Sequence, residues 1–511
     1  MRRRDFIGGS AAALAAGGLL TPRSARAATW GTAPAESAAM LLGEGVRAES
    51  VLEVFMYGGL GPFESFYVVE DYGRPTDPDY PDQQWWLFAN DHNRVYGGQC
   101  AVPRDQWLAP FGFDALGAQV NLGPVVWPLR QRADILSRMR IVVTRHDLEP
   151  HEAAIPYMLS GMRLGNVRMT GLGAHVQRYF LENRTVPGRI APYSYVLTPS
   201  NILSTDNLRA ASATGLHPGA ARPLSLTISS RDNLAELLAR GHLTAETRPK
   251  VDALLGYYRD AADLRHSIPG GERLRSRALD DHGFAIGSVL TAPELAVILG
   301  NGWLSPEGHA ACDQSEDLDY VRVGIRAAAQ LFNHPTDPAR YINVIDTGLE
   351  LADGGGGYDT HFDHLYPQAR NATSLFQDLA DHVNEPGEGD STKIDLDKTM
   401  ILLTTEFGRT PFAQELFGRP GDGTNHHPYG FVSVMIGGPI GPDQAGIVGA
   451  IGPDGSSSDY VSPSELRAAS LAAMGIYPFT HESFAVGDIR DVGTERDGLA
   501  WVTEQVLGRA V

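Results

Sequence analysis

Short apolar runs alternate with amphipathic helical patterns along this chain, and this alternation constrains the fold more than any other feature of the sequence. Each run has the length and the apolar content of a buried strand, and the clearest are Val51–Met56, Ile141–Thr144, Tyr341–Ile345, Met400–Thr405 and Phe431–Ile436. Between them lie stripes of helical spacing, such as Ala372, Leu375, Phe376, Leu379 and Val383. The alternation predicts an α/β fold with a doubly wound, mostly parallel sheet and helices on both faces.

Two segments refine this picture. Residues from about 205 to 335 contain few strand patterns, and Leu234–Leu264 has the pattern of paired amphipathic helices. We therefore expect a helical insertion at about 205–335 within a single domain that spans 28–511. Near the end of the chain Ser462, Pro463 and Glu465 form the start signal of a helix, and Gly475 follows as its stop signal.

The first 27 residues have the features of an export signal. Arg2, Arg3 and Arg4 precede an apolar, glycine-rich run from Phe6 to Leu20, and Ala25-Arg26-Ala27 resembles a cleavage site. The arginine pair followed by Asp5, Phe6 and Ile7 resembles a bacterial twin-arginine signal. The sequence therefore predicts a signal peptide at 1–27 and a periplasmic or secreted protein that crosses the membrane already folded.

Charge and composition limit the partners. The chain carries 42 Lys and Arg against 61 Asp and Glu, so its formal charge is −19, and removal of the leader takes it to −23. Such an acidic protein repels a phosphate backbone, so nucleic acid is excluded as an expected partner. No later stretch has the ~20 apolar residues of a membrane span, so no membrane insertion is expected. The two cysteines, Cys100 and Cys312, either pair after export or are separate buried thiols.

Polar side chains follow several of the predicted strands where each strand ends. Ligands of doubly wound sheets bind outside these carboxyl ends, and the segments concerned are Tyr57–Phe66, Arg145–Glu152, Tyr358–His364, Glu406–Thr410 and Asn425–Pro428. Carboxylates suit Mg²⁺, Ca²⁺ or Mn²⁺, and imidazoles suit Zn²⁺. The sequence therefore predicts a divalent metal site with ligands drawn from Asp359, His361, Glu406, His426 and His427. Adjacent residues of an extended segment point to opposite sides, so only one of the last two should face the metal.

Three further residues are catalytic candidates. Arg409 either clamps a phosphate or sulfate group beside the metal or forms a salt bridge with Glu406. Ser65 is a possible nucleophile or simply a helix cap in a tight glycine turn, and Glu64 stands beside it. Because no G-x-S-x-G elbow or Walker A loop is present, serine-esterase chemistry and NTP binding have no support.

Taken together, these motifs resemble the exported bacterial proteins of the domain-of-unknown-function 1501 family, which is similar to sulfatases of the alkaline-phosphatase-like superfamily. The resemblance runs from about residue 50 to 480, and its most specific block is Glu406–Pro411. The other matching motifs are Gly58-Gly59, Glu64-Ser65-Phe66, His151 before Met158–Gly161, Tyr358–His361 and His426-His427-Pro428. The resemblance implies an alkaline-phosphatase or sulfatase-like fold, with no settled activity.

This chain also departs from those patterns. Tyr57 stands where the superfamily's first strand ends in a metal-binding Asp, and Glu406-Phe407 replaces an Asp-His pair. Gly61 replaces a Ser of the family, and Glu64-Ser65 replaces Asp-Thr. Two usual ligands of a two-metal site are therefore missing, and we expect a single site.

Two functions follow from these observations. One is a metal-dependent hydrolase of phosphate or sulfate esters, acting on an anionic small-molecule or polymer ester. In it the metal polarises the ester, Arg409 holds the anion, and Ser65 or water attacks. The other is a non-catalytic binding or assembly protein that has kept the fold with an eroded metal site.

Overall fold

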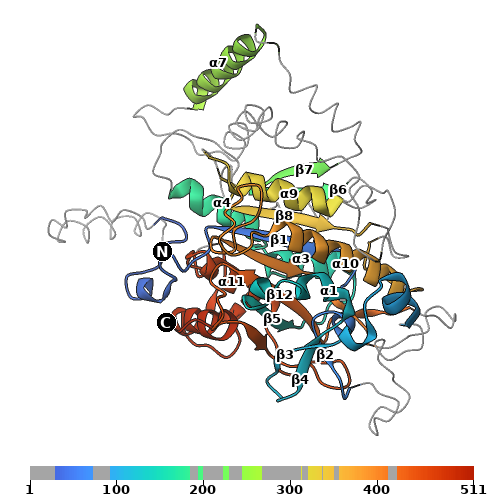
Figure 1. The fold of residues 1–511 in the computed structure, drawn as a ribbon. Helices are drawn as coiled ribbons and strands as arrows, with labels where there is room; N and C mark the ends of the chain where they lie inside the picture. The colour runs from blue at the N-terminus through green and yellow to red at the C-terminus, as the bar shows by residue number, and fades with distance from the viewer. Residues whose placement is uncertain are drawn as a thin grey trace, which may run out of the picture.

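The computed structural model describes most of the chain and places most of its strands in one large sheet (Figure 1). The described residues are 29–72, 93–183, 194–199, 223–228, 244, 246–266, 312, 320–335, 338–349, 356–411, 423–480 and 482–510. The predicted leader, 1–27, and the first of the two helices expected in Leu234–Leu264 lie outside them.

The large sheet has eight strands and is mostly parallel, as predicted. In spatial order they are β13 (Gly446–Val448), β5 (Met139–Thr144), β12 (Phe431–Gly437), β9 (Thr399–Thr404), β1 (Ser50–Met56), β8 (Tyr341–Asp346), β6 (Ser194–Pro199) and β7 (Leu224–Ile228). All neighbouring pairs are parallel except those of β12, which runs antiparallel to β5 and β9. All five predicted runs are strands of this sheet, and they include its central members.

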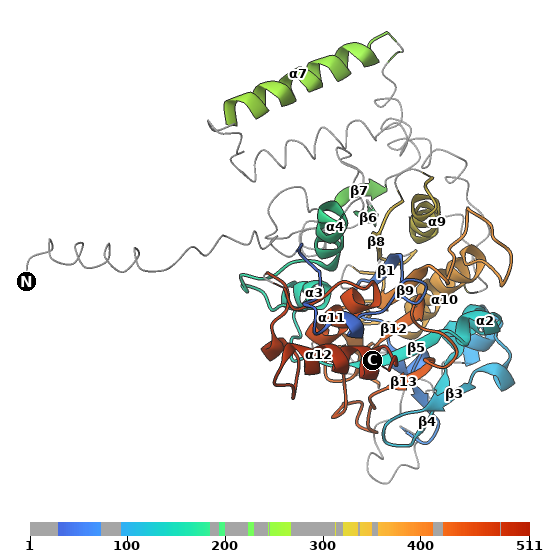
Figure 2. The same ribbon diagram turned by 90° about the vertical axis from the view of Figure 1, so that its left-hand side faces the viewer.

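Helices cover both faces of the sheet, as Figure 2 shows with the strands between them. Residues alternate between the faces along each strand, so Leu52 and Val54 of β1 join one apolar core, while Val51 and Phe55 join the other. The first core packs against α1 (Trp127–Arg130), α9 (Tyr320–Phe332) and α10 (Leu365–His382). The second packs against α3 (His151–Ser160), α4 (Leu172–Glu182), α11 (Pro463–Ala473) and α12 (Glu495–Trp501). The result is a helix–sheet–helix sandwich.

Smaller elements complete the described fold. An antiparallel sheet has the order β2 (Val68–Val69), β4 (Gln119–Leu122), β3 (Ala109–Phe113), and β10 (Gly408–Arg409) pairs with β11 (His426–His427). Two further helices are α2 (Ala133–Leu136) and α7 (Arg248–His266). Short helical turns lie at η1 (Ala38–Met40), η2 (Pro62–Glu64), η4 (Asn93–Gln99), η5 (Arg104–Gln106), η6 (Pro124–Val126), η7 (Val486–Asp488) and η8 (Val502–Val506).

The interval expected to form a helical insertion contains more than helices. α7 lies in it as expected, but β7 is a strand of the main sheet and α9 packs against β8 and β6. The described parts at both ends of the interval therefore belong to the sheet layer and to the helix layer on it. The single-domain organisation stays a prediction.

Two local predictions are resolved by the structure. Ser462 caps α11 through a capping box with Glu465, with Pro463 in the first turn, as the sequence indicated. Cys100 and Cys312, which are 212 residues apart, form a disulfide. Among the described residues, no helix is long and apolar enough to cross a membrane.

Candidate metal centre

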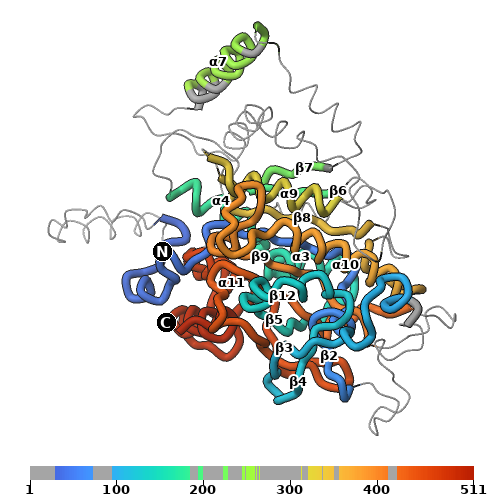
Figure 3. The backbone as a smooth tube through the Cα atoms, in the orientation of Figure 1, coloured from blue at the N-terminus to red at the C-terminus, as the bar shows by residue number. Residues whose placement is uncertain are grey.

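The polar strand ends meet at one edge of the large sheet. β1, β5, β8 and β9 end at this edge because they run in the same direction, and β12 begins there because it runs the opposite way. The tube in Figure 3 lets the reader follow the chain from each strand into the loops concerned. Segments far apart in the sequence therefore place their side chains around one point.

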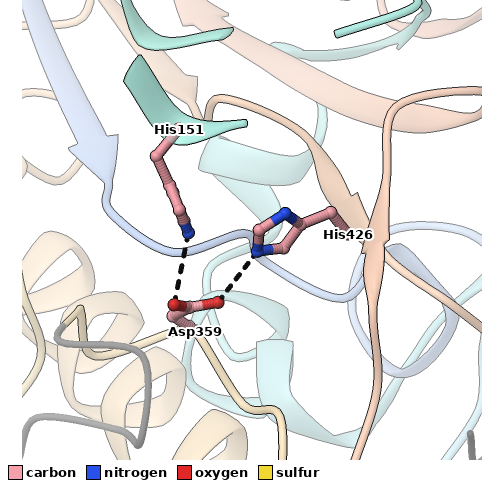
Figure 4. A group of neighbouring side chains, drawn as sticks. All are labelled: His151, Asp359 and His426. Carbon is pink, nitrogen blue, oxygen red and sulfur yellow. Dashed lines mark hydrogen bonds and ion pairs between the residues drawn. The ribbon is translucent and has the colours of Figure 1, made fainter. Parts of the chain in front are cut away.

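Three residues at this point have the arrangement of a metal site. One donor atom from each of His151, Asp359 and His426 lies within 4.8 Å of the others. Nε2 of His151 is 3.2 Å from Oδ2 of Asp359, and Nε2 of His426 is 3.2 Å from Oδ1 (Figure 4). Both imidazoles thus direct the same ring atom at the two oxygens of one carboxylate.

The other nitrogen of each ring is held by an oxygen acceptor. Nδ1 of His151 lies 2.8 Å from Oε1 of Glu406, and Nδ1 of His426 lies 2.7 Å from the backbone carbonyl oxygen of Glu149. In metal sites the ligating histidine usually donates its remaining N–H to a carboxylate or carbonyl, which fixes the tautomer and the ring orientation. Both histidines have this second contact.

His361 is a further candidate ligand at the same place. Its Nε2 is 3.0 Å from Oδ1 of Asp359 and 3.1 Å from Nε2 of His426. Its Nδ1 is buried without a hydrogen-bond partner among the described residues. The side chains of His151, His361 and His426 are 17–19% exposed, so the group is partly open to solvent.

Arg409 holds the carboxylate of Asp359 in place. Its guanidinium is completely buried, and Nη1 donates to Oδ1 of Asp359 at 2.8 Å and to the carbonyl of Gly58 at 3.1 Å. Nε and Nη2 donate to the hydroxyl and the carbonyl of Thr424. The salt bridge considered from the sequence exists, but its partner is Asp359 and not Glu406.

The turn after β1 reaches the site only because residue 58 is glycine. Gly58 has φ +115°, and a Cβ there would lie 2.2 Å from the backbone nitrogen of Asp359. Its N–H donates to Oε1 of Glu406 at 2.9 Å. The glycine therefore lets the β1 turn pack against Asp359 and hold Glu406.

Charge interactions shift the pKa values of the central groups. Burial opposes the charge of Asp359, but hydrogen bonds from His151, His361 and His426, together with Arg409, hold the pKa of its carboxyl well below the usual range. Burial likewise opposes the charge of His151, but hydrogen bonds to Asp359 and Glu406 raise its pKa to about 10. Burial lowers the pKa of His426. Without a metal, Asp359 and His151 are an ion pair.

Glu406 and His427 do not belong to the group of three. Glu406 is buried, and of the three residues it contacts His151 alone. His427 is also buried, and its Nε2 bonds to the carbonyl of Gly455, so the neighbouring His426 is the one that faces Asp359.

Ser65 and Glu64 lie in the turn around η2 and are both buried. The hydroxyl of Ser65 donates to the carbonyl of Gly61 at 2.5 Å, and Glu64 bonds to His364. No contact joins Ser65 to His151, Asp359 or His426 among the described residues. The structure thus places Ser65 in the turn-stabilising role that the sequence left open.

The member of this group of three that the predicted ligand set lacked is His151. It is the first residue of α3 and follows the loop after β5, so its position beyond a strand end was visible in the sequence. Its neighbour in space, Asp359, is 208 residues away along the chain.

Comparison with known proteins gives a partial match. Residues 340–491 match the model of a family described as a protein of unknown function (DUF1501). The match includes Asp359, His361, Glu406, Arg409 and His426 but not His151. No curated protein matches the chain.

Proposed function

We propose that this protein is a metal-dependent hydrolase of phosphate or sulfate esters with a sulfatase-like, alkaline-phosphatase-like core. The observation that carries the proposal is the pair of imidazoles that aim Nε2 at Asp359 while acceptors hold each Nδ1. Three protein ligands at a solvent-accessible position are typical of catalytic metal sites, which keep a coordination position open. Sites at the carboxyl ends of parallel strands also commonly bind small ligands.

The donor set fits a divalent cation and narrows its identity. His151 and His426 supply nitrogen, Asp359 supplies oxygen, and His361 is placed to supply a second or third imidazole. Nitrogen ligands favour Zn²⁺ over Ca²⁺, Mg²⁺ or Mn²⁺, which suit oxygen ligands. A divalent ion held there would polarise the ester and acidify an attacking water.

The surrounding residues position the ligands. Glu406 holds the ring of His151, and Arg409 holds Asp359 in the orientation that offers both oxygens to the histidines. Arg409 is thereby a positioning residue and not the anion clamp considered from the sequence. Tyr57 packs edge-on against His151, with ring centroids 5.5 Å apart, and forms part of the wall of the site.

Water is the nucleophile in this proposal. Ser65 is buried, and its hydroxyl proton is engaged by Gly61. A serine nucleophile needs an exposed hydroxyl within reach of a base. The partly exposed face of the three histidines is where a water and an ester can enter.

A second candidate function is a non-catalytic binding protein whose ion is structural. The burial of Arg409 favours it, because the arginine that would bind an oxyanion substrate is already committed to Asp359 and Thr424.

The test measures the metal content of the wild type and its variants together with their turnover of aryl phosphates and aryl sulfates. Asp359→Asn and His426→Gln should lose both metal and activity, because each removes a donor that faces the centre. His427→Gln is the matched control: this adjacent histidine bonds to Gly455, so the variant should keep both. Wild-type protein with metal but no turnover would favour the binding protein, and folded wild type without metal would remove the metal proposal.

We further propose that the protein is exported through the twin-arginine route. The disulfide between Cys100 and Cys312 supports an oxidising compartment. Replacing Arg3 and Arg4 by lysine should keep the precursor in the cytoplasm, and export of that variant would contradict the route.

A further inference from the structure

A cavity of about 490 Å³ opens between α3 and α11, beside the loop that leads to His151. Its size is within the range of small-ligand sites. Its walls carry three arginines, Arg145, Arg163 and Arg490, and two carboxylates, Asp147 and Asp488, each of which is paired with an arginine. Three cationic side chains in one cavity are unexpected on a protein whose overall charge is strongly negative.

Arg145 is the strongest feature of this cavity. Its Nη1 donates to the carbonyl of Ser457, and its guanidinium carbon lies 5.9 Å and 5.4 Å from the ring centroids of Tyr429 and Tyr460. No carboxylate pairs with it in the described part of the chain, and Nε and Nη2 have no protein partner there. The guanidinium is therefore held in place by stacking and by one carbonyl, with N–H donors left for a ligand.

The two other arginines can add to an anion site. Arg163 pairs with Asp147, but the two side chains are 53% and 63% exposed, so this ion pair is weak and an oxyanion can replace the carboxylate. Arg490 bonds to the buried Glu465 through Nε and lies 4.0 Å above the ring of Tyr460. Arg490 is thus fixed at the wall, and Arg163 lies 5.2 Å from the ring centroid of Tyr157, which also lines the cavity.

The cavity and the candidate metal centre share α3 and the loop before it. Tyr157 lines the cavity and lies on the same helix as His151. His146 lines the cavity too, and its Nε2 bonds to the backbone carbonyl of Glu406 at 2.6 Å. The cavity is therefore connected to the candidate metal centre through α3 and through this contact with Glu406.

We propose that this cavity is a second oxyanion subsite, which holds another phosphate or sulfate group of the substrate whose ester is cleaved at the metal centre. The proposal rests on the proposed function for the role of the metal centre. The substrate class is then a molecule with at least two such groups. A local cluster of arginines also gives an anionic substrate an attractive path to a protein of negative charge.

The first experiment uses inorganic phosphate and the full-length Asp359→Asn variant, so that a metal cannot account for binding. Calorimetric titration should show phosphate binding that Arg145→Gln, added to this background, weakens about tenfold or more. Arg163→Gln, at an exposed position where folding is not at risk, should weaken it as well. Arg104→Gln is the matched control, because Arg104 also stacks on an aromatic ring, Trp107, but lies outside the cavity.

The second experiment tests whether one ligand binds the cavity and the metal centre at the same time. In a series of bisphosphates with increasing spacer length, at least one member should bind metal-loaded wild type at least tenfold more tightly than phosphate does. Arg145→Gln should remove that gain while leaving the metal content unchanged.

The outcomes separate this inference from the proposed function. Folded Asp359→Asn protein that does not bind phosphate, or binds it equally with and without the Arg145→Gln and Arg163→Gln changes, overturns the subsite. Wild type that binds phosphate through Arg145 but carries no metal overturns the proposed function and the link to its substrate, and leaves an anion site alone.

Discussion

His151 has both ring nitrogens engaged by carboxylates, Asp359 on one side and Glu406 on the other. Two acceptors on one imidazole require a proton on each nitrogen, in agreement with the pKa of about 10. In the metal-free protein the fold raises the pKa of His151 above its ordinary value of 6.5, so the protonated form of this histidine stabilises the fold. The stabilising ion pair is fully present below pH 6.5 and is lost as the pH rises through 10.

Metal binding should therefore release the second proton of His151 at pH 7. A metal needs His151 as neutral imidazole, whereas Asp359 is already ionised because its pKa is lowered. The affinity for Zn²⁺ should rise about tenfold per pH unit between pH 7 and pH 9. Calorimetry in two buffers with different ionisation enthalpies measures the proton release directly. Binding without proton release would contradict the charged state of His151.

Arg409→Ala should destabilise the fold as well as weaken the metal site. The substitution leaves the carboxylate of Asp359 and the carbonyls of Gly58 and Thr424 without their buried donors, which typically costs about 3–5 kcal/mol. The stability of Arg409→Lys should lie between the stabilities of the wild type and of Arg409→Ala, because lysine keeps the charge but loses the planar set of N–H donors. Denaturant unfolding and metal analysis check this. Unchanged stability with a loss of substrate binding alone would restore the role of an anion clamp.

The individual residues of the site were only partly predictable from the sequence. Asp359, His361 and His426 were named because each stands beyond a strand-like run, and the structure brings them together. Which residue of His426-His427 faces the site depends on the pairing of Gly408 and Arg409 with them, which the sequence does not show. Glu406 was expected as a ligand, but a ring of His151 stands between it and Asp359.

At the level of elements, an uninterrupted apolar run decided what could be predicted. β1, β8, β9, β12 and β5 are apolar along most of their length because helices cover both sheet faces, so each stands out in the sequence. β7 is at the sheet edge with Ser225 and Thr227 exposed, and β13 has only three residues. Such strands lack the continuous apolar signal, and they were not predicted.

The capping box of α11 gives a prediction at this scale. Ser462 accepts the N–H of Glu465, while the Glu465 side chain accepts the N–H of Ser462. Ser462→Ala should lower the free energy of unfolding by about 1 kcal/mol, with a range of about 0.5–2. Ser137→Ala is the control, because its exposed hydroxyl bonds only to the carbonyl of Asp134, and it should stay within about 0.5 kcal/mol. Equal losses of unfolding free energy in the two variants would show that the capping box does not stabilise the protein.

For the molecule as a whole, one buried charged pair ties the sheet to a helix layer. Glu53 lies in the middle of the central strand β1, and Arg467 of α11 reaches it with two hydrogen bonds of 2.6 Å and 2.8 Å. Tyr341 of β8 and Thr404 of β9 donate to the same carboxylate. Three adjacent strands and one helix thus share one carboxylate, although in the sequence Glu53 is only a polar interruption of an apolar run.

Glu53→Gln should therefore destabilise the whole fold without touching the metal centre. The amide cannot neutralise Arg467, and a buried charge left without its partner typically costs about 3–5 kcal/mol.

The double variant Glu53→Leu with Arg467→Met removes both charges, so it should recover part of that loss. The recovery stays incomplete because the hydroxyls of Tyr341 and Thr404 lose their acceptor, at about 1–3 kcal/mol each. Denaturant midpoints of Glu53→Leu, Arg467→Met and the double variant form the cycle that isolates the pair. Metal content, measured alongside, should stay at the wild-type level in every folded variant. A double variant no more stable than Glu53→Gln would show that the hydroxyl contacts, and not the charge of Arg467, dominate this junction.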